Sequence, residues 1–196
     1  MDKEATFDEG FPDSLRDEYT HVISTITEGV DNLNYKIVDG YNSENEIYVL
    51  SDGTRIRFPY RIYLQEDDVA YSHLNYNERL IYNCIFTRSD NGHIREENLR
   101  FLLAKDIPEW CFPYIVRLSS DYVLEIVSEV YKGLKQHDNR SLQEFCKNNP
   151  EIMQTAYRRM FSYWNEYYRR DFPKLNTYIG WKLFSECLLP DVSNIT

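Results

Sequence analysis

The sequence predicts an α+β fold that is mostly α-helical, with an N-terminal helix, a small antiparallel β-sheet and C-terminal helical hairpins. After residue 77, apolar residues recur at the spacing of a buried helix face. Between about residues 35 and 64, β-branched and aromatic residues flank the pairs Asp39-Gly40 and Asp52-Gly53, which is typical of hairpins. A chain of 196 residues that is 42% hydrophobic fits one globular domain.

The domain is predicted to span residues 14–196, after an acidic tail over 1–13 in which five carboxylates accompany a single lysine. Residues 14–76 hold a helix and the small sheet, and residues 77–190 form a helical bundle.

In the first part, Ser14 is the expected N-cap of a helix over 14–28, because apolar residues follow it at helical spacing. A sheet of two or three strands is expected next. Pro59 ends a strand or lies at a sheet edge, because it has no N–H to donate to a ladder. The acidic run Glu66-Asp67-Asp68 is interpreted as a solvated loop.

The helical part is predicted to begin with Asn77 as the N-cap of its first helix. A polar turn over 90–92 leads to the second helix. Pro108 falls in the first turn of a third, where its missing N–H costs little. Asp121 begins a fourth helix.

Three further helices complete the chain. Ser141 and Glu144 have the spacing of a capping box and predict a helix start. Pro150 opens the longest helix, which runs to about Arg170, and a last helix covers 175–189.

The turn Asp90-x-Gly92-x-Ile-Arg95 resembles the inter-helix turn of HEAT-like repeats, which implies that Asp90, Gly92 and Arg95 brace a helical hairpin. The span from Gly53 to Leu134 resembles an uncharacterised protein family of low-GC Gram-positive bacteria. The residues that carry this resemblance are Arg-Phe-Pro-Tyr-Arg-Ile-Tyr, Ile-Phe-Thr-Arg-Ser-Asp-Asn-Gly and Arg-Glu-Glu-Asn-Leu. It implies a bacterial, cytoplasmic protein and brings no activity with it.

Charge and motif content favour a protein partner. The net charge of −10 disfavours a nucleic-acid groove and suits a basic protein. The four cysteines form no Cys-x-x-Cys pair, and we expect neither a metal nor a cofactor. The chain has no apolar run of membrane-spanning length, so we expect a cytoplasmic protein with no membrane partner. The oligomeric state stays open.

The candidate binding residues lie in the segment 150–170, where arginines alternate with aromatic residues. They are Arg159, Tyr163, Trp164, Tyr167 and Arg170. Such residues bind single-stranded nucleic acid by charge and stacking. Arg159 and Arg170 are eleven residues apart, close to three helical turns, so they would share a face. In the alternative interpretation the aromatic side chains form a core stripe and the arginines face water.

The function favoured by these observations is a non-enzymatic interaction or regulatory protein. An immunity, inhibitor or anti-defence role suits a small acidic chain. The first alternative is a nucleic-acid-binding protein that uses the segment 150–170. The second is an enzyme whose site is assembled from distant residues, with His73 or His93 beside carboxylates.

Overall fold

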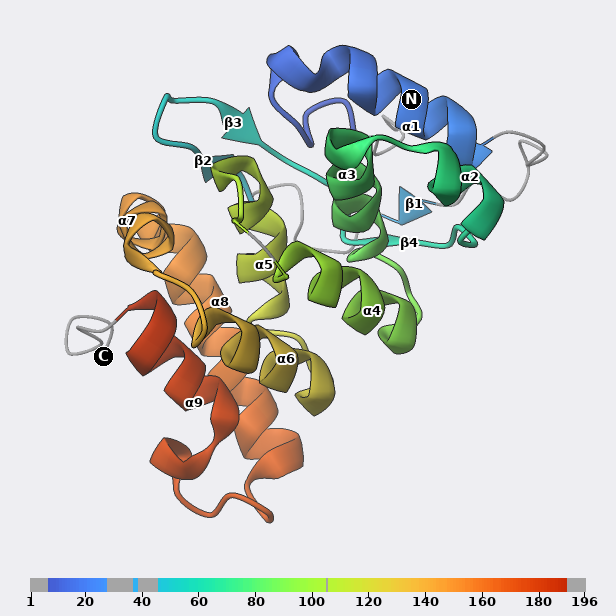
Figure 1. The fold of residues 1–196 in the computed structure, drawn as a ribbon. Helices are drawn as coiled ribbons and strands as arrows, with labels where there is room; N and C mark the ends of the chain where they lie inside the picture. Colours follow the sequence, from blue (N-terminus) through green and yellow to red (C-terminus); the bar gives the residue numbers. More distant parts are fainter. Residues whose placement is uncertain (1–6, 28–36, 39–45, 105, 190–196) are drawn as a thin grey trace.

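The computed structural model describes residues 7–27, 37–38, 46–104 and 106–189. Its fold class is the predicted one, α+β and mostly α, with helices arranged around two short antiparallel ladders (Figure 1). Within these residues, no helix is both long and apolar enough to cross a bilayer.

The predicted acidic tail is wrong from residue 7 onward. Phe7 and Phe11 are buried, and the ring of Phe11 stacks on Tyr114 with centroids 5.5 Å apart. The Tyr114 hydroxyl donates to the carbonyl oxygen of Gly10 at 2.8 Å. Burial of these two rings offsets the cost of ordering the acidic segment, so the charges remain outside while the aromatic residues join the core.

The first helix, α1 (Arg16–Thr27), follows a 3₁₀ turn at Asp13–Leu15 and buries Val22 and Ile26. Strand β1 (Ile37–Val38) pairs antiparallel with β4 (Arg61–Ile62). The second ladder joins β2 (Tyr48–Val49) to β3 (Arg55–Ile56).

The predicted hairpin at Asp52-Gly53 connects β2 and β3. Gly53 has φ +86°, a conformation that suits glycine, and its N–H donates to the carbonyl of Leu50 at 3.0 Å. The other predicted turn, Asp39-Gly40, lies outside the described residues. Pro59 lies in the link between β3 and β4, beyond the end of β3 at Ile56, and so belongs to neither strand.

An asparagine side chain occupies the second edge of β2. Asn149 Oδ1 accepts from the N–H of Val49 at 2.8 Å, and Asn149 Nδ2 donates to the carbonyl of Val49 at 2.9 Å. This side-chain amide therefore takes the place of a third strand.

The remaining helices fall close to the predicted positions, with one addition. Their bounds are α2 (Asp68–His73), α3 (Tyr76–Phe86), α4 (Gly92–Leu102), α5 (Phe112–Leu118), α6 (Leu124–Leu134), α7 (Arg140–Asn148), α8 (Pro150–Tyr163) and α9 (Ile179–Leu183). A 3₁₀ turn at Glu109–Cys111 precedes α5. Helices α8 and α9 continue as π-helical turns over Trp164–Tyr168 and Phe184–Leu188.

Several predicted helix starts are corrected. Helix α2 stands where an acidic loop was expected, because the Asp67 side chain accepts from the N–H groups of residues 69 and 70. Asn75, and not Asn77, caps α3 and forms a capping box with Glu78. Ser141 lies inside α7, whose N-cap is residue 139. Helices α2 and α3 are capped by the side chains of Asp67 and Asn75, and α7 starts one residue before Ser141.

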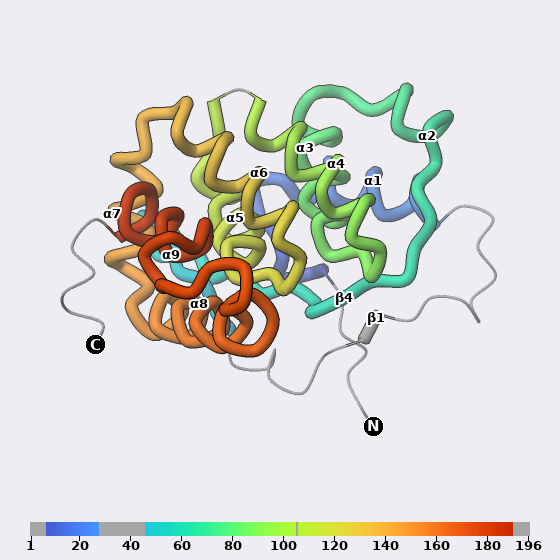
Figure 2. The backbone as a smooth tube through the Cα atoms, turned by 90° about the horizontal axis from the view of Figure 1, so that it is seen from below, coloured from blue at the N-terminus to red at the C-terminus, as the bar shows by residue number. Residues whose placement is uncertain are grey.

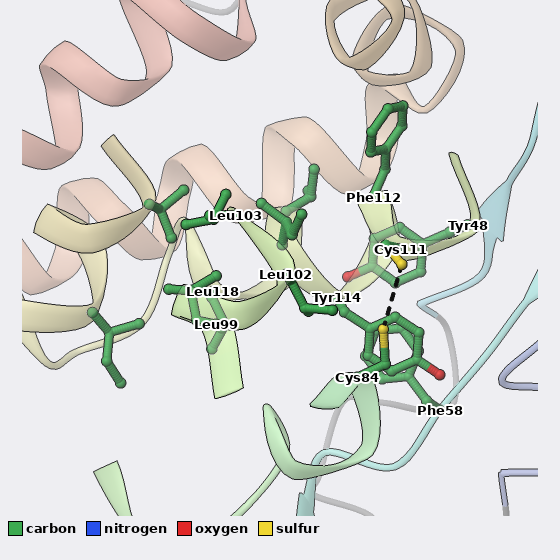
Figure 3. Packing of buried hydrophobic residues seen from close by; sticks show 14 of the residues in the cluster. Tyr48, Phe58, Cys84, Leu99, Leu102, Leu103, Cys111, Phe112, Tyr114 and Leu118 are labelled. Atoms are coloured by element: carbon green, nitrogen blue, oxygen red, sulfur yellow. Dashed lines mark hydrogen bonds between the residues drawn. The ribbon is translucent and has the colours of Figure 1, made fainter. Parts of the chain in front are cut away.

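Helix α5 is the centre of the molecule. All its residues are buried, and it lies between α3 and α8 in both views (Figures 1 and 2). Just before it, Cys111 Sγ lies 3.8 Å from Cys84 Sγ, beside the stacked rings of Phe58 and Tyr114, whose centroids are 4.1 Å apart (Figure 3). The core therefore joins residues from both parts of the chain.

Replacing Phe7 by alanine tests the corrected N-terminal boundary. We expect Phe7→Ala to lower the free energy of unfolding by about 3 kcal/mol, because it leaves a cavity in the core. Urea denaturation measures this change. Phe161→Ala is the matched control, because Phe161 is exposed and its loss should change stability little. An equal loss of the free energy of unfolding in the two variants would mean that Phe7 is not part of the core, and would favour the predicted acidic tail.

The four cysteines, all buried as free thiols, should be unreactive in the folded protein. Burial raises the pKa of Cys187 to about 11 and that of Cys84 well above its ordinary value, and only the thiolate is nucleophilic. At pH 8 a chromogenic disulfide reagent should label no thiol in the native protein and all four in denaturant. Fast labelling of any native thiol contradicts this account.

Candidate functional site: an arginine cluster beside a tyrosine ridge

Five arginines from distant parts of the chain gather where its two parts meet, and we call them the arginine cluster. They are Arg61 in β4, Arg88 just after α3, Arg95 in α4, Arg117 in α5 and Arg159 in α8. Two carboxylates serve them among the described residues, those of Glu46 and Asp121. The cluster therefore concentrates largely buried positive charge in a chain whose net charge is negative.

Arg88 fastens the segment before β4 to the end of α3. Its backbone carbonyl accepts from the N–H of Ile62 at 2.9 Å. Its fully buried guanidinium donates to the carbonyls of Pro59, at 3.3 Å, and Tyr60. Burial lowers the pKa of Arg88 well below its ordinary value, and the charges of Arg117 and Arg61 lower it further. Arg88 is thus a structural cation held by carbonyl dipoles.

Asp121 bridges two members of the cluster. Its oxygens lie 3.2 Å from Arg95 Nη2 and 3.3 Å from Arg61 Nη2, and it also accepts from the N–H of Val123 at 3.0 Å just before α6. All three charged side chains are buried or nearly so. Buried charges require such pairing, so Asp121 ties β4, α4 and the start of α6 together.

Arg95 also contacts the turn between α3 and α4, where the sequence predicted a brace. Its Nη1 donates to the carbonyls of Ser89 and Asp90, both at 2.9 Å. The Asp90 side chain is exposed, and the carboxylate partner of Arg95 is Asp121 instead. Gly92 begins α4 with a negative φ, so the backbone does not demand a glycine there.

Arg117 and Arg159 share the carboxylate of Glu46. Arg117 Nε lies 3.4 Å from Glu46 Oε2, and Arg159 pairs with the other oxygen. The Tyr60 ring lies against the cluster, with its centroid 5.0 Å from the Arg117 guanidinium carbon and 4.7 Å from that of Arg61. This geometry gives cation–π contacts at the half-buried rim of the cluster.

A row of tyrosines, the tyrosine ridge, extends from this rim along the end of α8. It consists of Tyr122, Tyr163 and Tyr167. Ring centroids are 6.3 Å apart for Tyr122 and Tyr163, and 6.1 Å apart for Tyr163 and Tyr167. Tyr122 is 46% exposed and Tyr167 is 61% exposed. The Tyr168 hydroxyl donates to the Tyr122 carbonyl at 2.6 Å, so the neighbour of Tyr167 is tied to the other end of the ridge.

The sequence-predicted binding residues separate into two groups. Arg159 lies in the arginine cluster, while Tyr163 and Tyr167 belong to the tyrosine ridge. Trp164 is buried, and its Nε1 donates to the Phe172 carbonyl at 2.9 Å, so it serves the core. Arg170 is exposed beyond the π-helical turn. That turn interrupts the α-helical phase, so a spacing of eleven residues does not place Arg159 and Arg170 on one face.

Arg61, Arg88, Arg117 and Asp121 did not appear among the predicted binding residues. For Arg117 the signal in the sequence is an arginine inside an apolar run, Ile-Val-Arg117-Leu. A charge at such a position needs a partner, but the partner lies far away in sequence. Arg61 and Asp121, for example, are sixty residues apart.

The histidines offer little to an assembled active site. His73 and His93 are exposed, and the imidazole of neither makes a hydrogen bond or ion pair to another described residue. His21 Nδ1 lies 2.6 Å from Glu78 Oε1, but Glu78 also accepts from the N–H of Asn75 in the capping box of α3. In the described part of the chain, no group of His, Cys, Asp and Glu has the arrangement of a metal site.

No family model, curated protein or solved structure matches the chain. The resemblances to HEAT-like turns and to a Gram-positive bacterial family therefore stay predictions, and function is inferred from the geometry of the site.

Replacing Asp121 by asparagine tests the bridge at the centre of the cluster. We expect Asp121→Asn to lower the free energy of unfolding by about 3 kcal/mol, because two buried guanidiniums lose their shared countercharge. Chemical denaturation provides the measurement, with the exposed Asp171→Asn as control. A loss below about 1 kcal/mol, typical of a surface pair, would mean that the bridge does not hold the fold.

Proposed function

We propose that this chain is a non-enzymatic binding protein that docks an acidic protein partner on the tyrosine ridge and the neighbouring rim of the arginine cluster. The observation that carries the proposal is the row of neighbouring rings from Tyr122 through Tyr163 to Tyr167, in which Tyr122 and Tyr167 are exposed and Tyr163 between them is half-buried. Beside it stands Arg159, whose charge is held in place by Glu46.

Tyrosine and arginine supply much of the energy of protein–protein interfaces. A tyrosine ring presents a large rigid surface and a hydroxyl at low cost in side-chain entropy. The ridge is also pre-ordered, because Tyr168 ties it to the Tyr122 carbonyl. Pre-ordering lowers the entropy that binding must overcome.

The sign of the local charge selects the partner. The net charge of −10 led us to expect a basic protein, but the arginine cluster beside the ridge holds five arginines against two carboxylates among the described residues. Arg169 and Arg170 follow the ridge and are exposed, as are Glu166 and Asp171. Complementary charge speeds association and fixes register, so an acidic surface suits this site better than a basic one. An immunity, inhibitor or regulatory role remains our prediction for the biological setting.

Truncating the ridge tests the proposal. Tyr167→Ala and Tyr122→Ala should each weaken binding of a stoichiometric protein partner, identified from cells that naturally contain this protein, by about tenfold or more. Titration calorimetry with the purified partner measures the affinity. Tyr63→Ala is the control, because Tyr63 is similarly exposed but lies just after β4.

Two results would count against an acidic protein partner at the ridge. One is equal binding by all three tyrosine variants and the unchanged protein. The other is binding of single-stranded DNA that weakens with salt and is lost in Arg159→Glu, which would favour a nucleic-acid-binding protein.

A further inference from the structure

We infer that the arginine cluster binds a phosphate-type oxyanion among Arg61, Arg117 and Arg159, with the hydroxyls of Tyr60 and Tyr163 completing the site. The inference rests on the proposed function in one respect, since the docked partner would present the anion as a phosphorylated side chain. The argument for the site itself comes from the positive charge of the cluster, the hydrogen-bond donors that have no acceptor among the described residues, and the groove at its edge.

The cluster carries more positive than negative charge. Four of the five guanidiniums share two carboxylates among the described residues, and Arg88 is bonded to carbonyls, which leaves a surplus of positive charge in a largely buried place. Burial of unpaired charge is costly. Burial and the charges of Arg95 and Arg117 lower the pKa of Arg61, against the opposite effect of Asp121. An anion would remove this repulsion.

Arg117 has donor capacity that the described residues do not fill. A guanidinium carries five N–H donors. Yet the Arg117 side chain, only 8% exposed, has a single polar contact to the described residues, the 3.4 Å approach of Nε to Glu46. This distance exceeds that of a good charged hydrogen bond. Arg88, by contrast, donates to three carbonyls, one from each guanidinium nitrogen, so its nitrogens already have hydrogen-bond partners.

Two tyrosine hydroxyls lie at the rim of the cluster. The hydroxyl of neither Tyr60 nor Tyr163 donates a hydrogen bond to a described residue. The Tyr60 ring lies against the guanidiniums of Arg61 and Arg117. Tyr163 follows Arg159 by four residues on α8, so their side chains share one helix face. Guanidinium forks and hydroxyls arriving from several directions suit a tetrahedral oxyanion, which accepts on several oxygens.

A groove between β2 and the start of α8 reaches the outer edge of the cluster. It has a volume of about 570 Å³, and its charged lining residues are Glu46, Glu151 and Arg159. The rest of the proposed site does not line this groove, so an anion from this side would meet Arg159 first and then Arg117, which shares Glu46 with it. A dianionic phosphate monoester matches the charge surplus better than a singly charged carboxylate or phosphodiester.

Thermal unfolding of the full chain in inorganic phosphate tests the site, with ionic strength held constant by sodium chloride. We expect a saturable rise in Tm of about 3–6 °C at roughly ten times the Kd. Arg117→Gln and Tyr163→Phe should each abolish most of this rise. Arg140→Gln, an exposed arginine on α7 paired with Asp138, should keep it. Tyr163→Phe removes only a hydroxyl and guards against misfolding of Arg117→Gln.

The absence of any saturable rise in phosphate overturns the inference, and so does a rise that both site variants retain in full. Phenyl phosphate and a short single-stranded oligonucleotide, titrated by calorimetry, identify the source of the anion. Tighter binding of the monoester supports a phosphorylated protein partner. Tighter binding of the oligonucleotide overturns it in favour of nucleic acid.

The same variants separate this site from the ridge. Tyr167→Ala should lose the protein partner and keep the phosphate response if both ideas hold. A partner that binds on the ridge while phosphate has no effect would retain the proposed function and remove the oxyanion site.

Discussion

The carboxylate of Asp121 is the interaction on which the arrangement depends. It is buried, and it can be buried because Arg61 and Arg95 approach it from β4 and α4 while it caps the chain ahead of α6. Those arginines are in turn positioned by the backbone that Arg88 fastens. A buried carboxylate without these cations would be costly. Asp121 therefore adds a shared charge to the apolar core that already joins the two parts of the chain, and the same contacts assemble the cluster.

Charge is distributed unevenly as a result. A chain with a net charge of −10 concentrates cations where its strands and helices converge and leaves acidic groups on the surface around them. Long-range steering of an acidic partner is weakened by this surrounding charge, whereas short-range recognition at the rim is strengthened by low dielectric and fixed geometry. A partner of this kind would be selected by fit at contact more than by attraction from a distance.

The sequence predicted most of the fold and part of the site, and the division has a physical cause. Helical periodicity is local, so the helices from α3 to α9 could be placed within a few residues. Caps depend on which of several adjacent polar side chains reaches the first N–H groups of the helix, and at α3 this is Asn75 and not Asn77. Helix α7 starts before Ser141, and the side chain of its N-cap residue makes no capping hydrogen bond. Burial of Phe7 and Phe11 depends on Tyr114, a hundred residues away. The arginine cluster is still less local, since Arg159 meets Glu46 across 113 positions. Periodicity carries no information about such pairs. Within the cluster, the sequence singled out Arg159 by its aromatic neighbours and Arg95 as a brace of the turn before α4.

The π-helical turn at Trp164–Tyr168 also accommodates an extra residue at this point of the chain. Before it, Met160 is packed in the core, and at its end the ring of Tyr168 stacks on Tyr178 with centroids 5.6 Å apart. If the same residues were wound as a regular α-helix, the downstream segment would be rotated by about 100°. Tyr168 would then leave both Tyr178 and the Tyr122 carbonyl. Related chains should accordingly keep this wide turn or, with one residue fewer, have a regular α-helix in its place.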